Sequence, residues 1–297
     1  MSEAIKNRYE FVVLFDVENG NPNGDPDAGN MPRTDPETSI GIVTDVCIKR
    51  KIRNYVELVQ ENVPGYNILI KADRALNTKF AEAYSECGYK PMKDNGKDAD
   101  EETKKDREKI NTTREYMCKN YFDVRTFGAV MNTGKNPCGI VRGPVQFTFA
   151  KSIDPVCLQD ITITRQGRTT EERMKTGDTE MGNKSVISYG LYSAEGYISA
   201  MLAQKVTGFS EDDLELLWNA IINMFEHDRS AARGKMTVHK LYIFKHQNAL
   251  GNAPAGILFD KINVQKKADV TIPRKFSDYE ISVDSAMPEG VEFIEKL

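Results

Sequence analysis

The fold of this chain is decided first by the stretch FVVLFDVENGNPNGDP, residues 11–26. Its first half is dense in Val, Leu and Phe, which predicts a buried strand over residues 8–17. Its second half gathers Asn, Gly, Asp and Pro, the residues that end strands and shape turns. The chain is therefore expected to leave a core strand and enter a long loop, called here the 19–35 loop.

The segment after this loop predicts a helix with a cationic face. Thr38 or Ser39 can cap its beginning. A core stripe at helical spacing comprises Ile48, Ile52, Tyr55 and Val59. Lys49 and Arg53 lie on a neighbouring stripe and are expected to project together, although Asp45 stands four residues before Lys49 and can pair with it. Strand, loop and basic helix together form a plausible phosphate-binding surface.

Length and composition indicate a folded protein with a substantial core. The chain has 297 residues, of which 40% are hydrophobic and 28% charged. It contains no run of about eighteen apolar residues, and its first residues lack the apolar segment of a signal peptide, so we expect a cytoplasmic protein without a membrane span. The net charge of -4 argues against a uniformly basic nucleic-acid binder. Any nucleic-acid surface must therefore be a local patch.

Cysteine and histidine usage does not predict a metal centre. The five cysteines stand far apart without a CxxC motif, which is typical of reduced, structural thiols. The three histidines, His227, His239 and His246, are scattered and favour core or surface roles. We expect neither a metal nor a cofactor.

The rest of the chain alternates between strand and helix patterns. Strands are expected at 121–131, at 143–150, where Val145, Phe147 and Phe149 alternate with polar residues, from Asp160, at 186–203 and at 236–244, with peripheral strands at 261–266, 279–283 and 291–294. Ser210 to Asp213 resembles a capping box and begins an amphipathic helix that ends near Gly234. The polar segment from Arg165 to Lys184 predicts a projecting hairpin or loop.

Residues 64–120 are expected to form an inserted helical subdomain, in which the charge-dense stretch 93–114 is a solvated helix face. Without the insertions, the order of elements approximates βαββαβ, the ferredoxin-like arrangement of an α+β protein. RNA-recognition modules use this topology, but their aromatic signature is not evident here.

Three motifs near the loops admit other interpretations. The pattern Asn19-x-Asn21-x-Asn23-Gly24 resembles the start of a calcium loop, but Asn30 stands where the bidentate Glu is needed. Residues 177–185 approach a Walker A motif but lack the strand that launches one. The loop carboxylates could hold a divalent metal for phosphodiester cleavage, or could simply shape turns; they are Asp16, Glu18, Asp25, Asp27 and Asp35.

Taken as a set, these residues resemble a known family. The string from Phe15 to Pro26, the following Arg33-Thr34-Asp35, the helix from Val46 to Arg53 and the stretch from His227 to Gly234 are similar to the CRISPR-associated Cascade backbone subunit of subtype I-C. The resemblance extends over essentially the whole chain. It implies one elaborated domain over residues 1–297 with a modified RNA-recognition-motif core, a helical finger insertion at 64–120 and a thumb hairpin at 160–187.

The resemblance also implies a function and a set of partners. Copies would stack head to tail along a CRISPR guide RNA and present its bases to target DNA, beside the subunit that caps the RNA 5′ end, the large subunit and the small subunit. Guide contacts are expected from Asn21, Gly24, Arg33, Lys49, Arg50, Arg53, Lys184, Arg229 and Arg233. Met174 and Met181 are candidate apolar wedges between bases. We expect no catalysis; the alternative is metal-dependent RNA cleavage by Asp25, Asp27 or Asp35, because related type III backbone subunits use an acidic loop residue.

Overall fold

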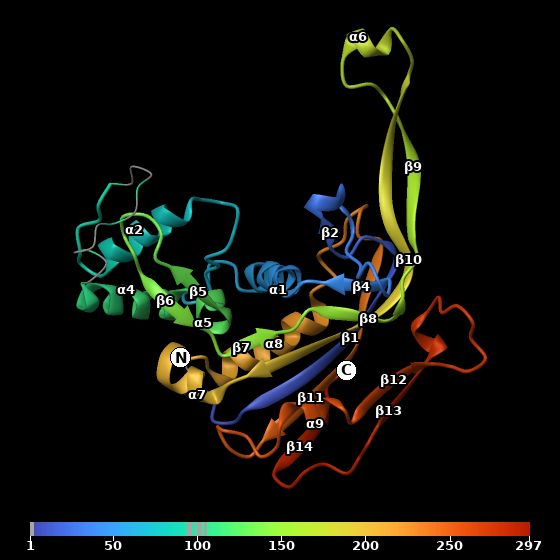
Figure 1. Cartoon of the computed structure of the whole chain (residues 1–297). Coiled ribbons are helices and arrows are strands. Elements are labelled where there is room, and N and C mark those ends of the chain that lie inside the picture. Colours follow the sequence, from blue (N-terminus) through green and yellow to red (C-terminus); the bar gives the residue numbers. More distant parts are fainter. Residues whose placement is uncertain (1–2, 94–96, 98, 100–102, 104–105) are drawn as a thin grey trace.

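The protein is a mixed α+β chain built on an antiparallel sheet in which β1 (Tyr9–Gly20) is central (Figure 1). The computed structural model describes residues 3–93, 97, 99, 103 and 106–297. The strand order is β14-β11-β1-β10-β8-β4, and β7 and β9 also pair with β10. Their bounds are β4 Ile40–Val43, β7 Val145–Phe147, β8 Ala150–Pro155, β9 Leu158–Gln166, β10 Thr179–Ile198, β11 Lys235–His246 and β14 Val291–Glu295.

Strand β1 is buried on both faces, which explains its continuous apolar run. Its odd-numbered residues, such as Phe11 and Phe15, pack toward α1 (Asp45–Val59) and α8 (Glu211–Asn223). Val12 and Leu14 face the opposite way and pack against the C-terminal segment. That segment contains α9 (Ala255–Phe259), β12 (Ile262–Lys266), a short 3-10 turn (Phe276–Asp278) and β13 (Tyr279–Val283).

The two principal helices begin at side-chain caps. Helix α8 begins with the expected capping box between Ser210 and Asp213, but it ends at Asn223, well before Gly234. Helix α1 begins after Thr44, whose hydroxyl accepts a hydrogen bond from the Cys47 backbone N–H at 3.3 Å. The prediction of a cap at Thr38 or Ser39 is wrong because residues 40–43 pair with β8 as a strand. The start of α1 therefore lies beside the sheet rather than in the loop.

The buried side of α1 differs from the predicted stripe. Ile48 and Ile52 are buried as expected, but the stripe continues through Val56, while Tyr55 is half-buried and Val59 is exposed. Lys51 is only 1% exposed. Since a lysine is rarely buried without a partner, this residue carries a structural or functional role.

A second hydrophobic cluster lies in the part of the chain inserted between α1 and β7 (Figure 1). Its elements are α2 (Leu76–Glu86), α4 (Arg107–Asn120), α5 (Phe122–Phe127), β5 (Gly128–Met131) and β6 (Gly139–Arg142). The expected strand over 121–131 is half wrong, because 122–127 is helical. Buried Arg125 explains this turn of helix, since it binds both carboxylate oxygens of Asp213 at 2.7 and 2.8 Å. The charge-dense stretch 93–114 lies partly outside the described residues.

The hairpin of β9 and the first half of β10 projects from the body, with α6 (Glu171–Met174) at its tip (Figure 1). Short pieces complete the chain: β2 (Gly24–Asp25), β3 (Met31–Pro32) and α7 (Ala200–Leu202). Within the described ranges, no helix has both the length and the apolarity that crossing a membrane requires.

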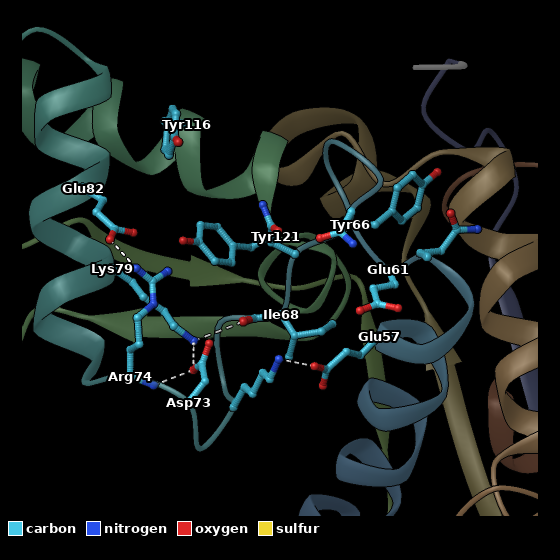
Figure 2. A pocket seen from close by; sticks show the side chains of 14 residues that line it. Glu57, Glu61, Tyr66, Ile68, Asp73, Arg74, Lys79, Glu82, Tyr116 and Tyr121 are labelled. Atoms are coloured by element: carbon cyan, nitrogen blue, oxygen red, sulfur yellow. Dashed lines mark hydrogen bonds and ion pairs between the residues drawn. The ribbon is translucent and has the colours of Figure 1, made fainter.

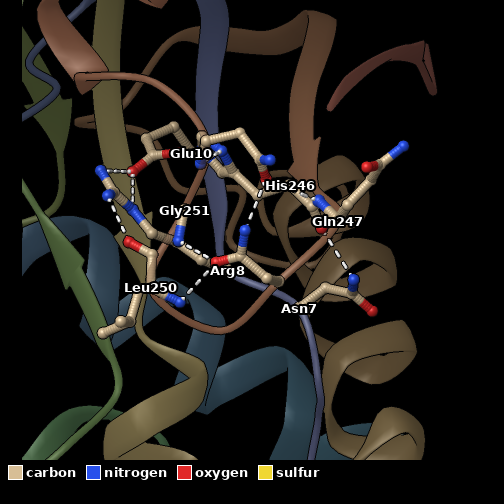
Figure 3. Close-up of polar contacts among 9 residues, drawn as sticks. Asn7, Arg8, Glu10, His246, Gln247, Leu250 and Gly251 are labelled. Carbon is tan, nitrogen blue, oxygen red and sulfur yellow. Dashed lines mark hydrogen bonds and ion pairs between the residues drawn. The ribbon is translucent and has the colours of Figure 1, made fainter. Parts of the chain in front are cut away.

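Where β1 begins, a buried polar network joins it to β11 (Figure 3). The Glu10 carboxylate accepts a hydrogen bond from Arg8 Nε at 2.6 Å and lies 2.5 Å from His246 Nε2. The Asn252 backbone N–H donates to His246 Nδ1 at 2.8 Å, so Nε2 carries the proton and donates to Glu10. His246 is therefore a core histidine with both ring nitrogens satisfied.

Candidate functional site

The 19–35 loop, the beginning of α1 and the segment 230–233 enclose a groove of about 630 Å³, called here the loop groove. Its lining includes four cationic side chains, which are Arg33, Arg50, Lys51 and Arg233. Asp45 is the single carboxylate among the lining residues. Asn21 and Gly24 also line it, so five of the nine residues expected to contact RNA meet here, which are Asn21, Gly24, Arg33, Arg50 and Arg233.

The loop is held against its surroundings by asparagine side chains and close backbone approaches. Asn23 Oδ1 accepts hydrogen bonds from both the backbone N–H and the hydroxyl of Thr44, each at 2.9 Å. The Asn21 backbone N–H donates to the Ala232 carbonyl at 2.8 Å. A Cβ on Gly24 would lie 2.0 Å from Asn30 Oδ1, so a larger residue there would displace the Asn30 side chain. Asn23 was missed by sequence reasoning, because its partner is set by tertiary structure.

Two arginines in the loop groove keep unused hydrogen-bond donors. Arg33 Nε is buried and has no partner in the described chain, and its terminal nitrogen lies 3.3 Å from Asp25 Oδ1. Arg50 is exposed and makes no hydrogen bond or ion pair with the residues that the structure describes. An arginine presents five N–H donors in a planar fork that fits phosphate oxygens. These two side chains can therefore take an anion.

A buried ion-pair cluster supports the opposite wall of the groove. Lys51 Nζ pairs with Asp228, and Arg233 Nε lies 3.0 Å from the same carboxylate oxygen. The ammonium of Lys51 also lies 5.6 Å from the centre of the Phe225 ring. Burial lowers the pKa of Lys51 from its ordinary value, while the hydrogen bond to Asp228 acts in the opposite direction. The cluster fixes the segment 228–233 against α1. The sequence analysis did not predict this role for Lys51 or Asp228.

Lys49 and Arg53 share a helix face as their spacing predicts, but they lie outside the lining of the loop groove. Lys49 Nζ bonds to Asp45 Oδ2 at 2.9 Å, the pairing that the sequence left open. Arg53 Nε donates to Asp123 Oδ2 at 2.8 Å. Both cations also lie over the ring of Phe127, at 5.7 and 5.2 Å from its centre. Each charge is thus largely compensated within the chain.

The other expected contact residues are dispersed. Lys184 Nζ donates to the Ala231 carbonyl at 2.9 Å, which ties the base of the hairpin to the groove segment. Arg229 pairs with Glu226 at 2.6 Å on the surface. Met174 and Met181 are 56% and 77% exposed on the projecting hairpin. They are available to a partner but lie apart from the groove lining.

Three of the candidate carboxylates, Asp25, Asp35 and Asp16, are engaged in turns and pairs. Asp25 contacts Arg33 and accepts from the Asp27 backbone N–H at 3.1 Å. Asp35 accepts from two backbone N–H groups of its own turn, which lower its pKa from the ordinary value. Asp16 is 7% exposed and lies 2.9 Å from His239 Nε2. Among the described residues, no group of three or more His, Cys, Asp or Glu is arranged to hold a metal ion.

A second hollow of about 300 Å³ lies between α1 and the inserted helices (Figure 2). Each of its three cations has a carboxylate partner, Lys71 with Glu57, Arg74 with Glu82 and Lys79 with Asp73, and Glu61 adds a further carboxylate to the lining. Figure 2 shows Arg74 pointing toward Glu82 and Lys79 pointing toward Asp73. Because opposite charges alternate there, this hollow does not have the cationic surplus of the loop groove.

Comparison with known proteins places these features in a family. A family model described as CRISPR-associated protein Cas7 matches residues 7–284. The CRISPR-associated protein Cas7 of Haloferax volcanii is 28% identical over 246 aligned positions. The alignment covers 73% of this chain and 65% of that protein, so the chain spans slightly less than two thirds of its relative's length. Solved chains named "CRISPR RNA-guided surveillance complex, pre-nicking" and "CRISPR RNA-guided surveillance complex" align with 80% of this chain. The alignments cover 78% and 68% of the two solved chains, each at 14% sequence identity, with TM-scores of 0.47 and 0.45.

Proposed function

Because this chain belongs to the CRISPR-associated protein Cas7 family, we propose that it is the backbone subunit of an RNA-guided surveillance complex, of subtype I-C, and that its loop groove holds the phosphates of the guide RNA. The observation that carries this proposal is the set of unused arginine donors in the groove. Arg50 has no partner among the described residues and Arg33 Nε has no acceptor, whereas Lys51 and Arg233 already pair with Asp228. Phosphate neutralisation by Arg and Lys supplies most of the sequence-independent affinity for nucleic acid. The patch is local, which reconciles RNA binding with the net charge of -4.

The beginning of α1 adds a second source of positive potential. Thr44, Asp45, Val46 and Cys47 line the groove, so the first turn of this fifteen-residue helix opens toward it. Backbone N–H groups in the first turn of a helix lack partners within the helix and attract anions, as does the helix dipole. The Cys47 N–H is already capped by the Thr44 hydroxyl, so an RNA phosphate in the groove would meet the N–H groups of Asp45 and Val46 together with Arg33 and Arg50.

We infer that the core is a modified RNA-recognition fold. The order β11-β1-β10-β8, with α1 after β1 and α8 between β10 and β11, supports the ferredoxin-like arrangement. RNA-recognition modules stack bases on the free sheet face, but here Val12 and Leu14 on that face are covered by the C-terminal segment. The RNA is therefore proposed to follow the loop groove at the edge of the sheet.

The remaining parts of the proposal concern assembly. Residues 64–120 would form the fingers and 160–187 the thumb, whose exposed Met174 and Met181 are suited to wedge between bases. Copies stacked head to tail would add phosphate contacts along one guide, so a modest patch in each copy gives high avidity. The guide bases would pair with target DNA, and the RNA 5′-end-capping, large and small subunits would complete the complex.

We propose that the subunit is not catalytic. Asp25 and Asp35 already have roles in the loop, one as the partner of Arg33 and one as the acceptor of its own turn. In the presence of Mg²⁺, RNA complementary to the guide should remain intact when incubated with the assembled complex. Cleavage at regular spacing that Asp25→Ala, Asp27→Ala or Asp35→Ala abolishes would contradict this part of the proposal.

The test of guide binding compares two pairs of cations. Arg33→Ala with Arg50→Ala should weaken binding to single-stranded RNA and lower the slope of log K against log salt by about 1.4, since each phosphate contact on a single strand contributes about 0.7. Lys49→Ala with Arg53→Ala is the comparison pair, because it also removes two cations but both lie outside the groove lining. A larger loss in the comparison pair would move the RNA away from the loop groove.

A further inference from the structure

The sheet contains a β-bulge between β7 and β8. Phe147 pairs with Gly196 and Lys151 pairs with Ser193, both on β10. Between these pairs the first strand advances by four residues and its partner by three, so one residue is extra. The bulge is held at Thr148, whose backbone N–H donates to the Glu195 carbonyl at 2.9 Å and whose hydroxyl accepts from the Glu195 N–H at 3.2 Å.

The extra residue reverses which positions of the strand face the core. Val145 and Phe147 are buried before the bulge, and Ala150 and Ser152 are buried after it. Regular alternation would have buried Phe149 as well, as the sequence pattern predicts, but Phe149 is 51% exposed. The bulge turns this ring outward. Bulges often re-aim a side chain beside a functional site.

The exposed ring stands between two hollows. Phe149 lines the loop groove together with its four cations. It also lines another hollow of about 520 Å³, called here the β8 hollow, whose polar lining includes Thr148, Lys151, Ser193 and Glu195. No ring or cation contact to Phe149 occurs within the described part of the chain. A large apolar face is thus presented to solvent beside a phosphate-binding surface, with hydrogen-bonding groups on its far side.

From this geometry we propose that Phe149 is a base-stacking platform for the RNA held in the loop groove. The proposal rests on the guide-binding function proposed above and adds a base contact to it. Aromatic rings bind the face of any base, so the contact is tolerant of sequence. In this arrangement the phosphate lies on the cationic side of the Phe149 ring and the base stacks on the ring. The polar groups of the β8 hollow then lie within reach of the edge of the base.

The experiment uses the full chain and two single-stranded RNA probes of equal length. One probe carries 2-aminopurine, whose fluorescence is quenched by stacking, and the other carries abasic residues in place of bases. Phe149→Leu should weaken binding of the first probe by about 5- to 150-fold for each stacked base and should relieve its quenching. Phe149→Tyr should bind like the wild type. Neither variant should change binding of the abasic probe, since its phosphate contacts remain.

Ile140→Ala is the matched surface control, because Ile140 is 57% exposed on β6 and lies outside both hollows. Equal affinity and quenching for wild type and Phe149→Leu would overturn the stacking assignment. A Phe149→Leu variant that binds normally while Phe149→Ala loses self-association would instead identify an apolar contact with a second copy, which also overturns it. Wild-type protein that binds both probes equally retains the phosphate groove but not the stack, and failure to bind either probe removes both proposals.

Discussion

The buried pair of Lys51 and Asp228 predicts which of two single variants loses more free energy of unfolding. Asp228→Ala leaves Lys51, which is 1% exposed, without its carboxylate. Removing one partner of a buried ion pair typically costs about 3–5 kcal/mol, because the other charge stays buried and uncompensated. Lys51→Met leaves Asp228 with Arg233 at 3.0 Å and fills the space with an apolar chain. Lys51→Met should therefore lower the free energy of unfolding by the contribution of one hydrogen bond to a charged group, about 1.5–3 kcal/mol.

The double variant sharpens the test. In the Lys51→Met background, Asp228→Ala removes the carboxylate partner of Arg233 alone. The Arg233 side chain is 26% exposed and can be hydrated. The two changes should therefore cost less together than the sum of the single costs, with an interaction energy of about 0.5–3 kcal/mol.

Urea unfolding followed by the single tryptophan provides the assay. Trp218 lies in α8, is 2% exposed and belongs to the same core as Phe225, over which Lys51 lies. Its fluorescence should report the midpoints in the order wild type, Lys51→Met, Asp228→Ala from most to least stable. Additive costs, or an Asp228→Ala variant as stable as Lys51→Met, would refute the view that the uncompensated lysine sets the cost.

Two further predictions concern the helical insertion and the loop. The hydrogen bond from Lys79 lowers the pKa of Asp73 to about 2 from its ordinary 3.8, so this pair contributes stability above about pH 4 that is lost as the pH falls toward 2. Urea midpoints of the wild type should fall across that window more steeply than those of Asp73→Asn, and parallel curves would count against the pair. Gly234 has φ +62° and a Cβ there would lie 2.3 Å from the Asn19 carbonyl, so Gly234→Ala should cost about 1–3 kcal/mol and weaken RNA binding. Calorimetry with an unchanged Tm would exclude that close approach.

Elements defined by local patterns were predicted well from the sequence. The apolar run of β1, the capping box of α8 and the alternation of β11 depend on neighbours within a few residues. The short C-terminal strands were also placed correctly, because turn residues separate them. The cationic character of α1 could be seen for the same reason.

Elements decided by contacts across the fold were predicted poorly. The beginning of α1 moved to Thr44 because residues 40–43 pair with β8, which stands more than one hundred residues later. Residues 122–127 are helical around Arg125, whose partner Asp213 lies 88 residues away. Phe149 is exposed because the register of β10 changes opposite it. In each case, a distant partner outweighs a local preference.

Lys49 and Lys51 show the same division at the candidate site. The sequence alone determines that α1 carries a cluster of cations after a loop of turn formers, because charge and turn chemistry belong to individual residues. The spacing also allows Lys49 to pair with Asp45 on its own helix, as it does. Only the tertiary structure decides that Lys51 is buried against Asp228, 177 residues away. The fate of a lysine depends on which carboxylate the fold brings to it, since a buried charge is tolerated only with a partner.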